Sequence, residues 1–308
     1  MERKFLYLDP EEILESDDFK TIEYFLKSTY RMRIGWHYIV DLIWIYSKAK
    51  HWPDNYRVLD AGGGRGPAQF LLAEMGFNVT NIDLFHLIPY YAQRQRYKLH
   101  KTELDSYVAS DYVQHIESFR NIQQIIKIIV LGLIKMPVLR SISSYVYSHQ
   151  HEKWRRRFGF QDREVGSVEW VLGNLCDIPE YTDDTFDAVV SLSALEHIPI
   201  DVLPLAMSEI DRIVKPNGQW AITTSGTNKG ESWFHEPSKG YCFSESDFEK
   251  IFLAQNTNKI KADLIFNKYN NCAYLKDNLT SFYKKSGENG MPWGVWDPQY
   301  IPVGISNR

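Results

Sequence analysis

The feature that most constrains the fold of this chain is a glycine-rich turn between an apolar segment and a helix pattern. Residues 57–61 (Arg-Val-Leu-Asp-Ala) have the composition of a short buried strand, and a helix is expected over 67–75. The turn between them carries Gly62, Gly64 and Gly66. Glycines permit positive φ angles and let a ligand approach the backbone, while a helix N-terminus offers free N–H groups. The segment predicts a strand–turn–helix unit that binds a ligand at its bend.

Strand and helix patterns continue to alternate along the chain. Further strands are expected over 78–83, 168–172, 186–192, 219–224 and 261–266, with a helix over 201–213. A last strand over 300–306 is expected at an edge of the sheet, because a sheet tolerates Pro302 only there. Strands that alternate with helices favour a mostly parallel sheet with right-handed crossovers. The chain is therefore expected to have an α/β fold.

Two segments fall outside this alternation. Residues 1–55 have helical patterns broken at Gly35 and are expected to form an N-terminal helical cap. Residues 56–308 then form the main domain. Within it, residues 84–165 are much longer than an ordinary strand–helix–strand connection, and they hold 13 Lys and Arg against 7 Asp and Glu. We expect this basic insertion to be a helical cap subdomain over the carboxyl ends of the strands.

The composition excludes several classes of protein. A net charge of −4 argues against a nucleic-acid partner, which requires a strongly basic face. The three cysteines form no CxxC or Cys/His cluster, so no metal site is expected. The longest apolar run, 128–134, is far too short to cross a bilayer and lies between Lys127 and Lys135. The charged N-terminus has no apolar signal core, and the protein is expected to be cytoplasmic.

The glycine spacing distinguishes between two kinds of nucleotide site. The glycines follow the pattern Gly62-x-Gly64-x-Gly66, whereas a dinucleotide loop reads G-x-G-x-x-G. Asp83 ends the next expected strand, where its carboxylate can accept hydrogen bonds from both hydroxyls of a ribose. Together the turn and Asp83 predict a nucleoside site without a pyrophosphate.

These motifs resemble those of the class I methyltransferases that use S-adenosylmethionine (SAM). The similarity covers residues 57–84 and 168–226, and its motifs occur in the order typical of the family. It includes 173–179, which resembles the adenine segment, and 195–198 after the fourth strand of the family's sheet. The resemblance implies a Rossmann-like, mostly parallel, seven-stranded sheet with N-terminal helices and a helical insertion after the second strand.

The resemblance also implies where SAM binds. Asp60 is expected near the amino group of the methionine part and Asp83 at the ribose. Asn174 or Asp177 is expected at the adenine amino group. The expected SAM-binding residues are Asp60, Gly62, Gly64, Gly66, Asp83, Leu84, Asn174, Leu175, Asp177 and Ser193.

Transfer of a methyl group from a sulfonium requires alignment of the acceptor, and a base when the acceptor is a hydroxyl. His197, after the fourth strand of the family pattern, and His235, in an aromatic and polar loop after the fifth, are the expected catalytic residues. Trp36 and His37 lie where the N-terminal helices can close over SAM, although core packing is expected for Trp36.

Several functional alternatives stay open. The acceptor is expected to be a small molecule, a sugar or a lipid-linked group, with a hydroxyl preferred. The basic residues Lys127, Lys135, Arg140 and Arg155 to Arg157 can meet a phosphate, and 120–157 can make a peripheral contact with the inner face of a membrane. A nicotinamide-dependent oxidoreductase and a non-catalytic scaffold that binds SAM or a membrane are the competing functions.

Overall fold

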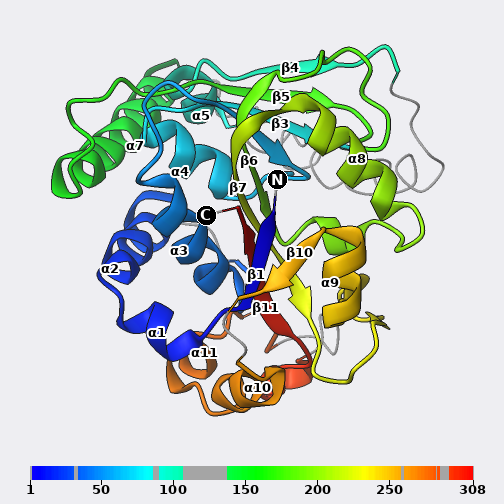
Figure 1. Ribbon diagram of the computed structural model, residues 1–308. Helices are drawn as coiled ribbons and strands as arrows, with labels where there is room; N and C mark the ends of the chain where they lie inside the picture. Colours follow the sequence, from blue (N-terminus) through cyan, green and yellow to red (C-terminus); the bar gives the residue numbers. More distant parts are fainter. Residues whose placement is uncertain are drawn as a thin grey trace.

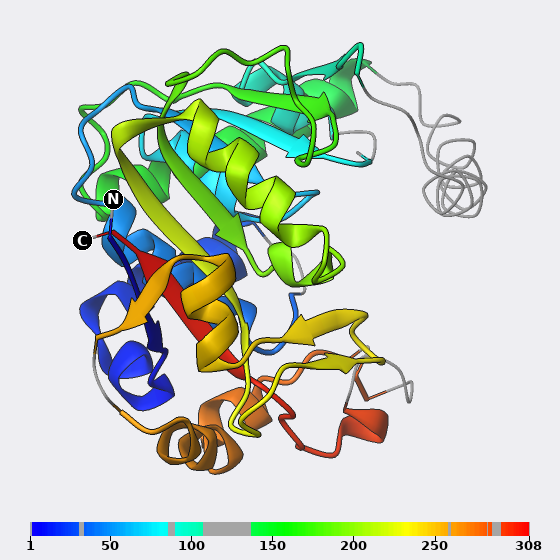
Figure 2. The same ribbon diagram turned by 45° about the vertical axis from the view of Figure 1, so that its right-hand side comes forward.

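The computed structural model describes residues 2–30, 34–85, 90–106, 137–257, 260–281, 283–284 and 291–307. The described residues form a nine-stranded sheet with helices on both faces (Figure 1 and Figure 2), in the order β10-β1-β11-β7-β6-β2-β3-β5-β4. The strands are β1 (Arg3–Tyr7), β2 (Arg57–Ala61), β3 (Asn78–Asp83), β4 (His100–Glu103), β5 (Val168–Leu172), β6 (Phe186–Leu192), β7 (Val214–Gly226), β10 (Ala254–Asn256) and β11 (Ile301–Ser306). A separate ribbon pairs β8 (Trp233–His235) with β9 (Gly240–Cys242).

The helices alternate with these strands along much of the chain. They are α1 (Pro10–Glu15), α2 (Asp17–Tyr24), α3 (Tyr38–Ala49), α4 (Ala68–Glu74), α5 (Tyr91–Arg96), α7 (Pro137–Arg157), α8 (Leu203–Ile213), α9 (Glu245–Ile251), α10 (Ala262–Asn270) and α11 (Ala273–Asp277). A π-helix, η1 (Phe25–Tyr30), continues α2, and two 3₁₀ turns are η2 (Leu195–His197) and η3 (Pro292–Gly294).

The parallel centre of the sheet confirms the expected Rossmann-like α/β fold. β2 and β3 have the predicted bounds, and β2 pairs in parallel with both β3 and β6. Helices cover both faces of the sheet, so these strands bury apolar residues continuously, as Val58, Leu59 and Ala61 do. The carboxyl ends of parallel strands meet at one edge of a sheet. The glycine turn after β2, the end of β3 and the turn η2 after β6 are therefore close together.

β11 lies inside the sheet, so the prediction of a C-terminal edge strand is wrong. It pairs antiparallel with β7 on one side and with β1 on the other. Pro302 is accommodated because Tyr7 is the last residue of β1 paired with β11, opposite Val303. The Pro302 carbonyl accepts a hydrogen bond from Leu8 at 2.9 Å. The proline nitrogen faces the same side and cannot donate the return hydrogen bond to the Leu8 carbonyl. That carbonyl accepts from the Tyr269 hydroxyl at 2.9 Å instead, so it is not left unsatisfied.

The N-terminal residues contribute a strand as well as the expected helices. β1 lies between β11 and β10, a position that the helical-cap prediction for residues 1–55 did not include. α3 packs flat on the sheet, and a Cβ on Gly304 of β11 would approach the Trp44 ring of α3 to 2.5 Å. The first 55 residues are thus joined to the sheet by a strand and a buried helix. The division into domains at residue 55 stays a prediction.

In the described part of the insertion, the Tyr90 ring lies against the Arg65 guanidinium of the glycine turn, 4.9 Å from centroid to guanidinium, whereas α7 lies elsewhere. The predicted cap over the carboxyl edge of the sheet stays a prediction. α7 packs against α5 and η1, and the Arg155 guanidinium in its last turn donates to the Glu74 carbonyl. Glu74 ends α4, whose other end follows the glycine turn, so this end of α7 is remote from the turn. The insertion also adds β4 to the sheet beside β5. Lys127 and Lys135, with the rest of 120–136, lie outside the described residues.

The C-terminal region differs from the sequence prediction at 261–266. This segment belongs to helix α10, because Ile265 and Tyr269 are one helical turn apart and both fully buried. The additional strands β1, β4 and β10 bring the sheet to nine strands where seven were expected.

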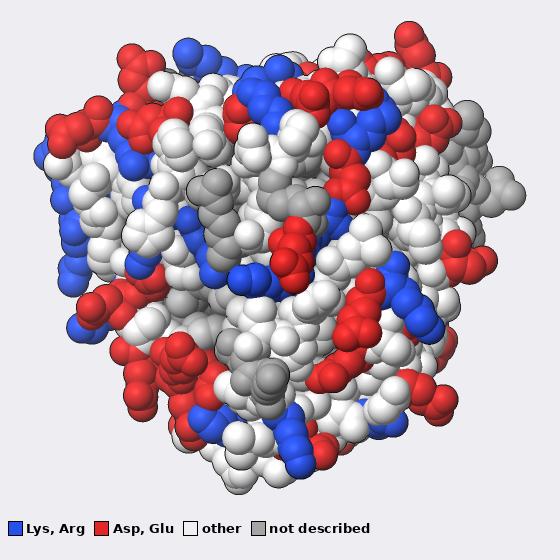
Figure 3. All heavy atoms as spheres, in the orientation of Figure 1, with Lys and Arg blue, Asp and Glu red and all other residues white. Residues whose placement is uncertain are grey.

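Acidic and basic side chains are interspersed on the face drawn in Figure 3, and among the described residues of that face no expanse of one sign dominates. The described helices include none with the length and hydropathy needed to cross a bilayer.

The packing of α3 on β11 makes a stability prediction. We expect Gly304→Ala to lower the free energy of unfolding by about 1–3 kcal/mol, because the added methyl overpacks the contact with Trp44. Urea denaturation measures the change. Leu205→Ala, at an exposed position of α8, is the control and should alter stability by less than about 0.5 kcal/mol. Equal stability of Gly304→Ala and the parent would contradict this account of the packing.

Candidate functional site

The glycine turn is held in a tight bend against two neighbouring strands. Gly62 and Gly64 have φ angles of 74° and 50°, a region that favours glycine. The Gly62 amide donates to the Ile82 carbonyl of β3 at 2.9 Å, and a Cβ on Gly62 would lie 2.8 Å from the Ala194 Cβ. The Gly66 amide closes the bend on the Gly63 carbonyl at 2.7 Å. The backbone at this turn is therefore close to both β3 and the end of β6.

Asp83 lies at the turn. Its Oδ2 accepts a hydrogen bond from the Gly64 amide at 2.8 Å, and its Oδ1 accepts one from the Phe85 amide at 3.2 Å. Burial raises the pKa of Asp83 to about 6, although these backbone hydrogen bonds oppose the shift. Each oxygen has a further lone pair, so the carboxylate can still accept hydrogen bonds from a ligand.

Asp60 is a buried acid beneath the same turn. Its side chain is 0% exposed, and neither carboxylate oxygen has a hydrogen-bond partner among the described residues. A Cβ on Gly63 would collide with this carboxylate, so the turn passes directly over it. Burial, with a smaller contribution from the nearby Asp83, raises the pKa of Asp60 to about 8. A cation bound beside these two acids would stabilise their ionised forms.

The expected adenine segment forms a compact turn after β5. The Asn174 side-chain oxygen accepts from the Cys176 amide at 3.1 Å, which closes the turn. Asp177 is exposed, and Leu175 is buried. Leu84, after β3, is exposed. The Asn174 oxygen keeps a second lone pair, so both Asn174 and Asp177 stay alternatives for the adenine amino group.

A polar pocket of about 180 Å³ lies at the carboxyl ends of β6 and β7. It is lined by Gly35, His37, Tyr38, Glu196, His197, Ser225, Ser238, Tyr283 and Tyr300. Ser225 belongs to β7, while Glu196 and His197 belong to the turn η2 that follows β6. The pocket therefore shares its edge of the sheet with the glycine turn.

A buried cluster of His37, Asp41 and Ser193 supports this pocket. His37 Nδ1 lies 2.6 Å from Asp41 Oδ2, and the Ser193 hydroxyl donates to the same oxygen at 3.0 Å. Asp41 is 0% exposed. Ser193 has a φ of 47°, an unfavourable value for a residue with a side chain. An Nδ1–H that donates to Asp41 leaves Nε2 as the proton acceptor of the neutral His37 ring.

Glu196 adds a second buried acid to the pocket wall. Its carboxylate accepts from the Thr224 hydroxyl at 3.0 Å and from the Ser225 hydroxyl at 3.4 Å. Burial raises the pKa of Glu196, and the nearby His197 and His37 oppose that shift. Neither this pocket nor any other part of the described structure contains a group of three or more His, Cys, Asp or Glu side chains placed to hold a metal ion.

The two histidines expected to be catalytic differ in their surroundings. His197 lines the pocket, and its Nδ1 lies 2.8 Å from the Lys239 carbonyl. His235 is buried at 4% exposure, with its Nδ1 2.7 Å from the Ser238 hydroxyl, and burial lowers its pKa. His235 contacts two residues that line the pocket, Ser238 and Tyr300. The centroids of the His235 and Tyr300 rings are 5.5 Å apart. Their catalytic roles stay predictions.

Comparison with known proteins agrees with this geometry. Residues 139–222 match the family model described as a methyltransferase domain, a segment that runs from α7 into β7 and includes η2. Over these residues the chain is similar to a methyltransferase domain. The glycine turn and Asp83 lie outside the matched residues, so the likeness of those motifs rests on the sequence pattern and on the hydrogen bond between Gly64 and Asp83.

Several solved structures resemble the methyltransferase domain in fold. A geranyl diphosphate C-methyltransferase from Streptomyces coelicolor A3(2) is 11% identical, with 85% of this chain and 73% of that chain covered and a TM-score of 0.43. The [4+2]-cyclase SpnF is 14% identical, with coverages of 89% and 83% and a TM-score of 0.46. The PH0226 protein from Pyrococcus horikoshii OT3 is 15% identical, with coverages of 68% and 63% and a TM-score of 0.34.

These similarities carry no information about the acceptor of the methyltransferase domain. In two of the matched structures the chain spans only 63% and 47% of the length of the other protein. No curated protein matches the chain in sequence.

Sequence reasoning missed several residues in and behind the pocket, among them Asp41, Glu196 and Tyr300. Asp41 had a usable signal, because it is an acid in an otherwise apolar helix segment and follows His37 by one helical turn. Glu196 and Tyr300 had none, because their burial depends on strands that are distant in sequence.

The raised pKa values of Asp60 and Asp83 predict that the protein releases protons when it binds SAM. Below pH 8 the free protein holds Asp60 largely protonated, and a bound cation favours the carboxylate. We expect the affinity for SAM to increase as the pH rises from about 6 to about 8, by at most about tenfold per pH unit, and to level off above that. Calorimetry in two buffers of different ionisation enthalpy measures the proton release at pH 7. Asp60→Asn should lose most of it, whereas proton uptake by the parent would contradict the model.

Proposed function

We propose that the methyltransferase domain transfers the methyl group of SAM to a hydroxyl of a small-molecule acceptor held in the polar pocket. The observation that carries the proposal is that His37 lines this pocket and is paired behind it with the buried Asp41, at the same edge of the sheet as the glycine turn. When bound, SAM supplies an electrophilic methyl group on a sulfonium, and S-adenosylhomocysteine (SAH) is left after transfer.

The residues at the turn suit a cationic nucleoside. The positive-φ glycines Gly62 and Gly64 expose backbone to a ligand, and Asp83 would accept hydrogen bonds from the ribose hydroxyls. The unpartnered oxygens of Asp60 would face the positively charged methionine part, for which they supply a counter-charge. Asn174 or Asp177 would accept from the adenine amino group, with Leu84 and Leu175 providing apolar contacts.

The pocket residues have the arrangement needed to activate a hydroxyl. His37 Nε2 would take the proton of the acceptor hydroxyl as its oxygen forms a bond to the methyl carbon and the bond from carbon to sulfur breaks. Asp41 fixes the ring through Nδ1 and stabilises the imidazolium that results. Glu196 would accept a hydrogen bond from a second polar group of the acceptor. At His197, by contrast, Nδ1 faces the neutral Lys239 carbonyl.

The glycine spacing disfavours the oxidoreductase alternative. A loop that binds the pyrophosphate of a nicotinamide cofactor reads G-x-G-x-x-G, whereas the third glycine here, Gly66, comes one residue too early. The scaffold alternative, a sugar or lipid-linked acceptor and contact with the inner face of a membrane stay predictions. The segment 120–157, on which membrane contact was predicted, is described only from residue 137, and the side chain of Arg140 is not among those described.

The cofactor assignment predicts the effect of a double substitution at the turn. Asp83→Ala with Gly64→Val should abolish the micromolar binding of SAM and SAH, because it removes the ribose acceptor and a positive-φ glycine. Calorimetry with purified protein measures both affinities. Asp105→Ala, an exposed acid on the same half of the sheet, is the control and should bind normally. If the unsubstituted protein binds neither ligand, the cofactor assignment is wrong.

The proposed base predicts a loss of turnover without a loss of cofactor binding. His37→Gln and Asp41→Asn should each lower methyl transfer from radiolabelled SAM to cell-extract fractions by about 10²–10⁴-fold, while SAH affinity changes by less than about threefold, or under 1 kcal/mol. His51→Gln, at an exposed position after α3, is the matched control. His235→Ala tests His235 as the alternative base. If His235→Ala loses turnover and His37→Gln keeps normal turnover, the assignment of the base to His37 is overturned.

A further inference from the structure

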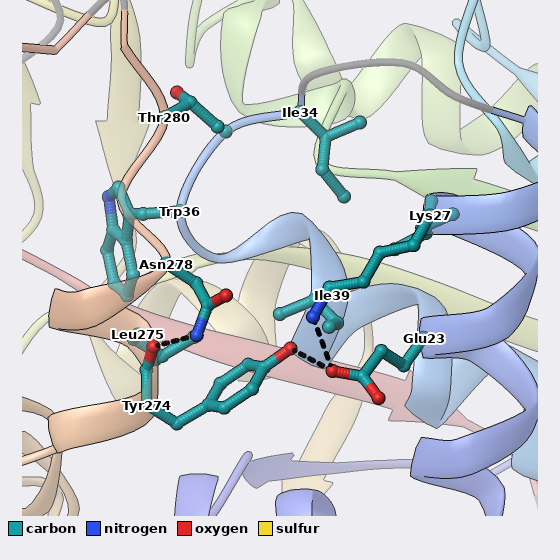
Figure 4. Close-up of a pocket in the computed structure, with 11 residues that line it drawn as sticks. Glu23, Lys27, Ile34, Trp36, Ile39, Tyr274, Leu275, Asn278 and Thr280 are labelled. Atoms are coloured by element: carbon teal, nitrogen blue, oxygen red, sulfur yellow. Dashed lines mark hydrogen bonds and ion pairs between the residues drawn. The ribbon is translucent and has the colours of Figure 1, made fainter.

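A second cavity adjoins the polar pocket. It has a volume of about 360 Å³ and lies between the N-terminal helices and α11 (Figure 4). Its walls come from Leu26 of η1, from the segment 34–39 and from Leu275 of α11. We call this cavity the apolar groove.

The apolar groove offers hydrocarbon walls and no net charge. Ile34, Trp36 and Ile39 project toward it from the segment before and within α3 (Figure 4). The charged side chains at its border neutralise each other, because Glu23 Oε1 accepts from Lys27 Nζ at 2.7 Å. The Tyr274 hydroxyl donates to the same Glu23 oxygen at 3.0 Å. The groove is therefore suited to an uncharged, apolar group.

The groove and the polar pocket meet at Gly35, which lines both. A Cβ on Gly35 would lie 3.2 Å from the Tyr283 hydroxyl and from the Tyr38 ring, so the absence of a side chain keeps the space between them. The neighbours of Gly35 line different cavities: Trp36 lines the groove and His37 lines the polar pocket. One short segment of backbone thus contributes to both.

Two further observations point to a ligand in the groove. Leu26 and Lys27 belong to the π-helix η1, a rare form of helix that is frequent at functional sites. The Thr280 hydroxyl, also in the lining, is buried and has no hydrogen-bond partner within the part of the chain that the structure describes. Such a buried hydroxyl is normally satisfied by a ligand or water.

The sizes of the two cavities indicate how they are used. Ligand pockets typically measure about 300–1,000 Å³, and the polar pocket, at about 180 Å³, falls below that range. We propose that the apolar groove binds an uncharged hydrocarbon chain or ring of the methyl acceptor, while its hydroxyl-bearing end occupies the polar pocket. The acceptor is thus an amphipathic small molecule. This inference rests on the proposed function, because it assigns the polar pocket to the acceptor.

Substitutions that fill the groove test the proposal with an apolar probe. N-phenyl-1-naphthylamine, an uncharged fluorophore, should bind the parent protein with increased fluorescence. Ile39→Trp should raise its dissociation constant at least about tenfold, and Ile34→Trp serves as a second variant in case the first does not fold. Leu205→Trp, which adds the same ring at an exposed site on α8, should leave the dissociation constant unchanged. Calorimetry with SAH checks that each variant retains the cofactor site.

A methyl-transfer assay links the groove to the acceptor. With radiolabelled SAM and cell-extract fractions, the labelled product should pass into butanol, and Ile39→Trp should lower its yield at least about tenfold while Leu205→Trp does not. Probe binding that Ile39→Trp and Ile34→Trp leave unchanged overturns the proposal, as does a labelled product that stays in water and forms normally in Ile39→Trp. Absence of SAH binding in the parent protein would instead contradict the proposed function.

Discussion

The contact between α3 and the sheet determines where the candidate site forms. α3 packs on β6, β7 and β11, and the absence of a side chain at Gly304 lets the Trp44 ring approach the strand. That packing brings Asp41 to within 3.0 Å of the Ser193 hydroxyl, at the carboxyl end of β6. His37 is one turn earlier on the same helix and thereby reaches the polar pocket. Without this contact, the glycine turn and Asp83 would still come together, but the pocket would lose one wall.

Buried acids are the second feature that organises the site. Asp41, Asp60 and Glu196 are each at most 3% exposed, and burying an ionised carboxylate without a partner is costly. Asp41 and Glu196 accept hydrogen bonds from neighbouring side chains, whereas both oxygens of Asp60 lack partners among the described residues. The protein therefore keeps a destabilising group at the position where a cation is expected. Such a cost is common at functional sites, where stability is given up for ligand binding.

Prediction from the sequence was most accurate where residues a few positions apart determine the local structure. The glycine turn and the strands at 57–61 and 78–83 could be predicted to the residue, because apolar runs and glycines act over a few positions. The hydrogen bond between Gly64 and Asp83 follows from the parallel order of β2 and β3. The interior position of β11 could not be predicted. Its neighbour β1 comes from the other end of the sequence, and a proline argues locally for an edge.

The same limit applies to the candidate site. His37 could be noted from its position, and helical spacing pairs it with Asp41. Only the burial of 40–46 in α3 shows that this pair lies in the protein interior. The segment 261–266 was predicted as a strand because its apolar residues are adjacent, although Ile265 and Tyr269 follow a helical period. In each case the structure of the segment depends on which of its faces is buried, and elements distant in the sequence decide that.

The pairing of β1 with β11 also has a consequence for synthesis of the chain. Nearly 300 residues separate these two strands, so β1 leaves the ribosome long before the strand that covers it. During that interval both β1 and β7 have an unpaired edge, and unpaired strand edges invite association with other chains. This half of the sheet can therefore close only after β11 has been made and inserted between β1 and β7.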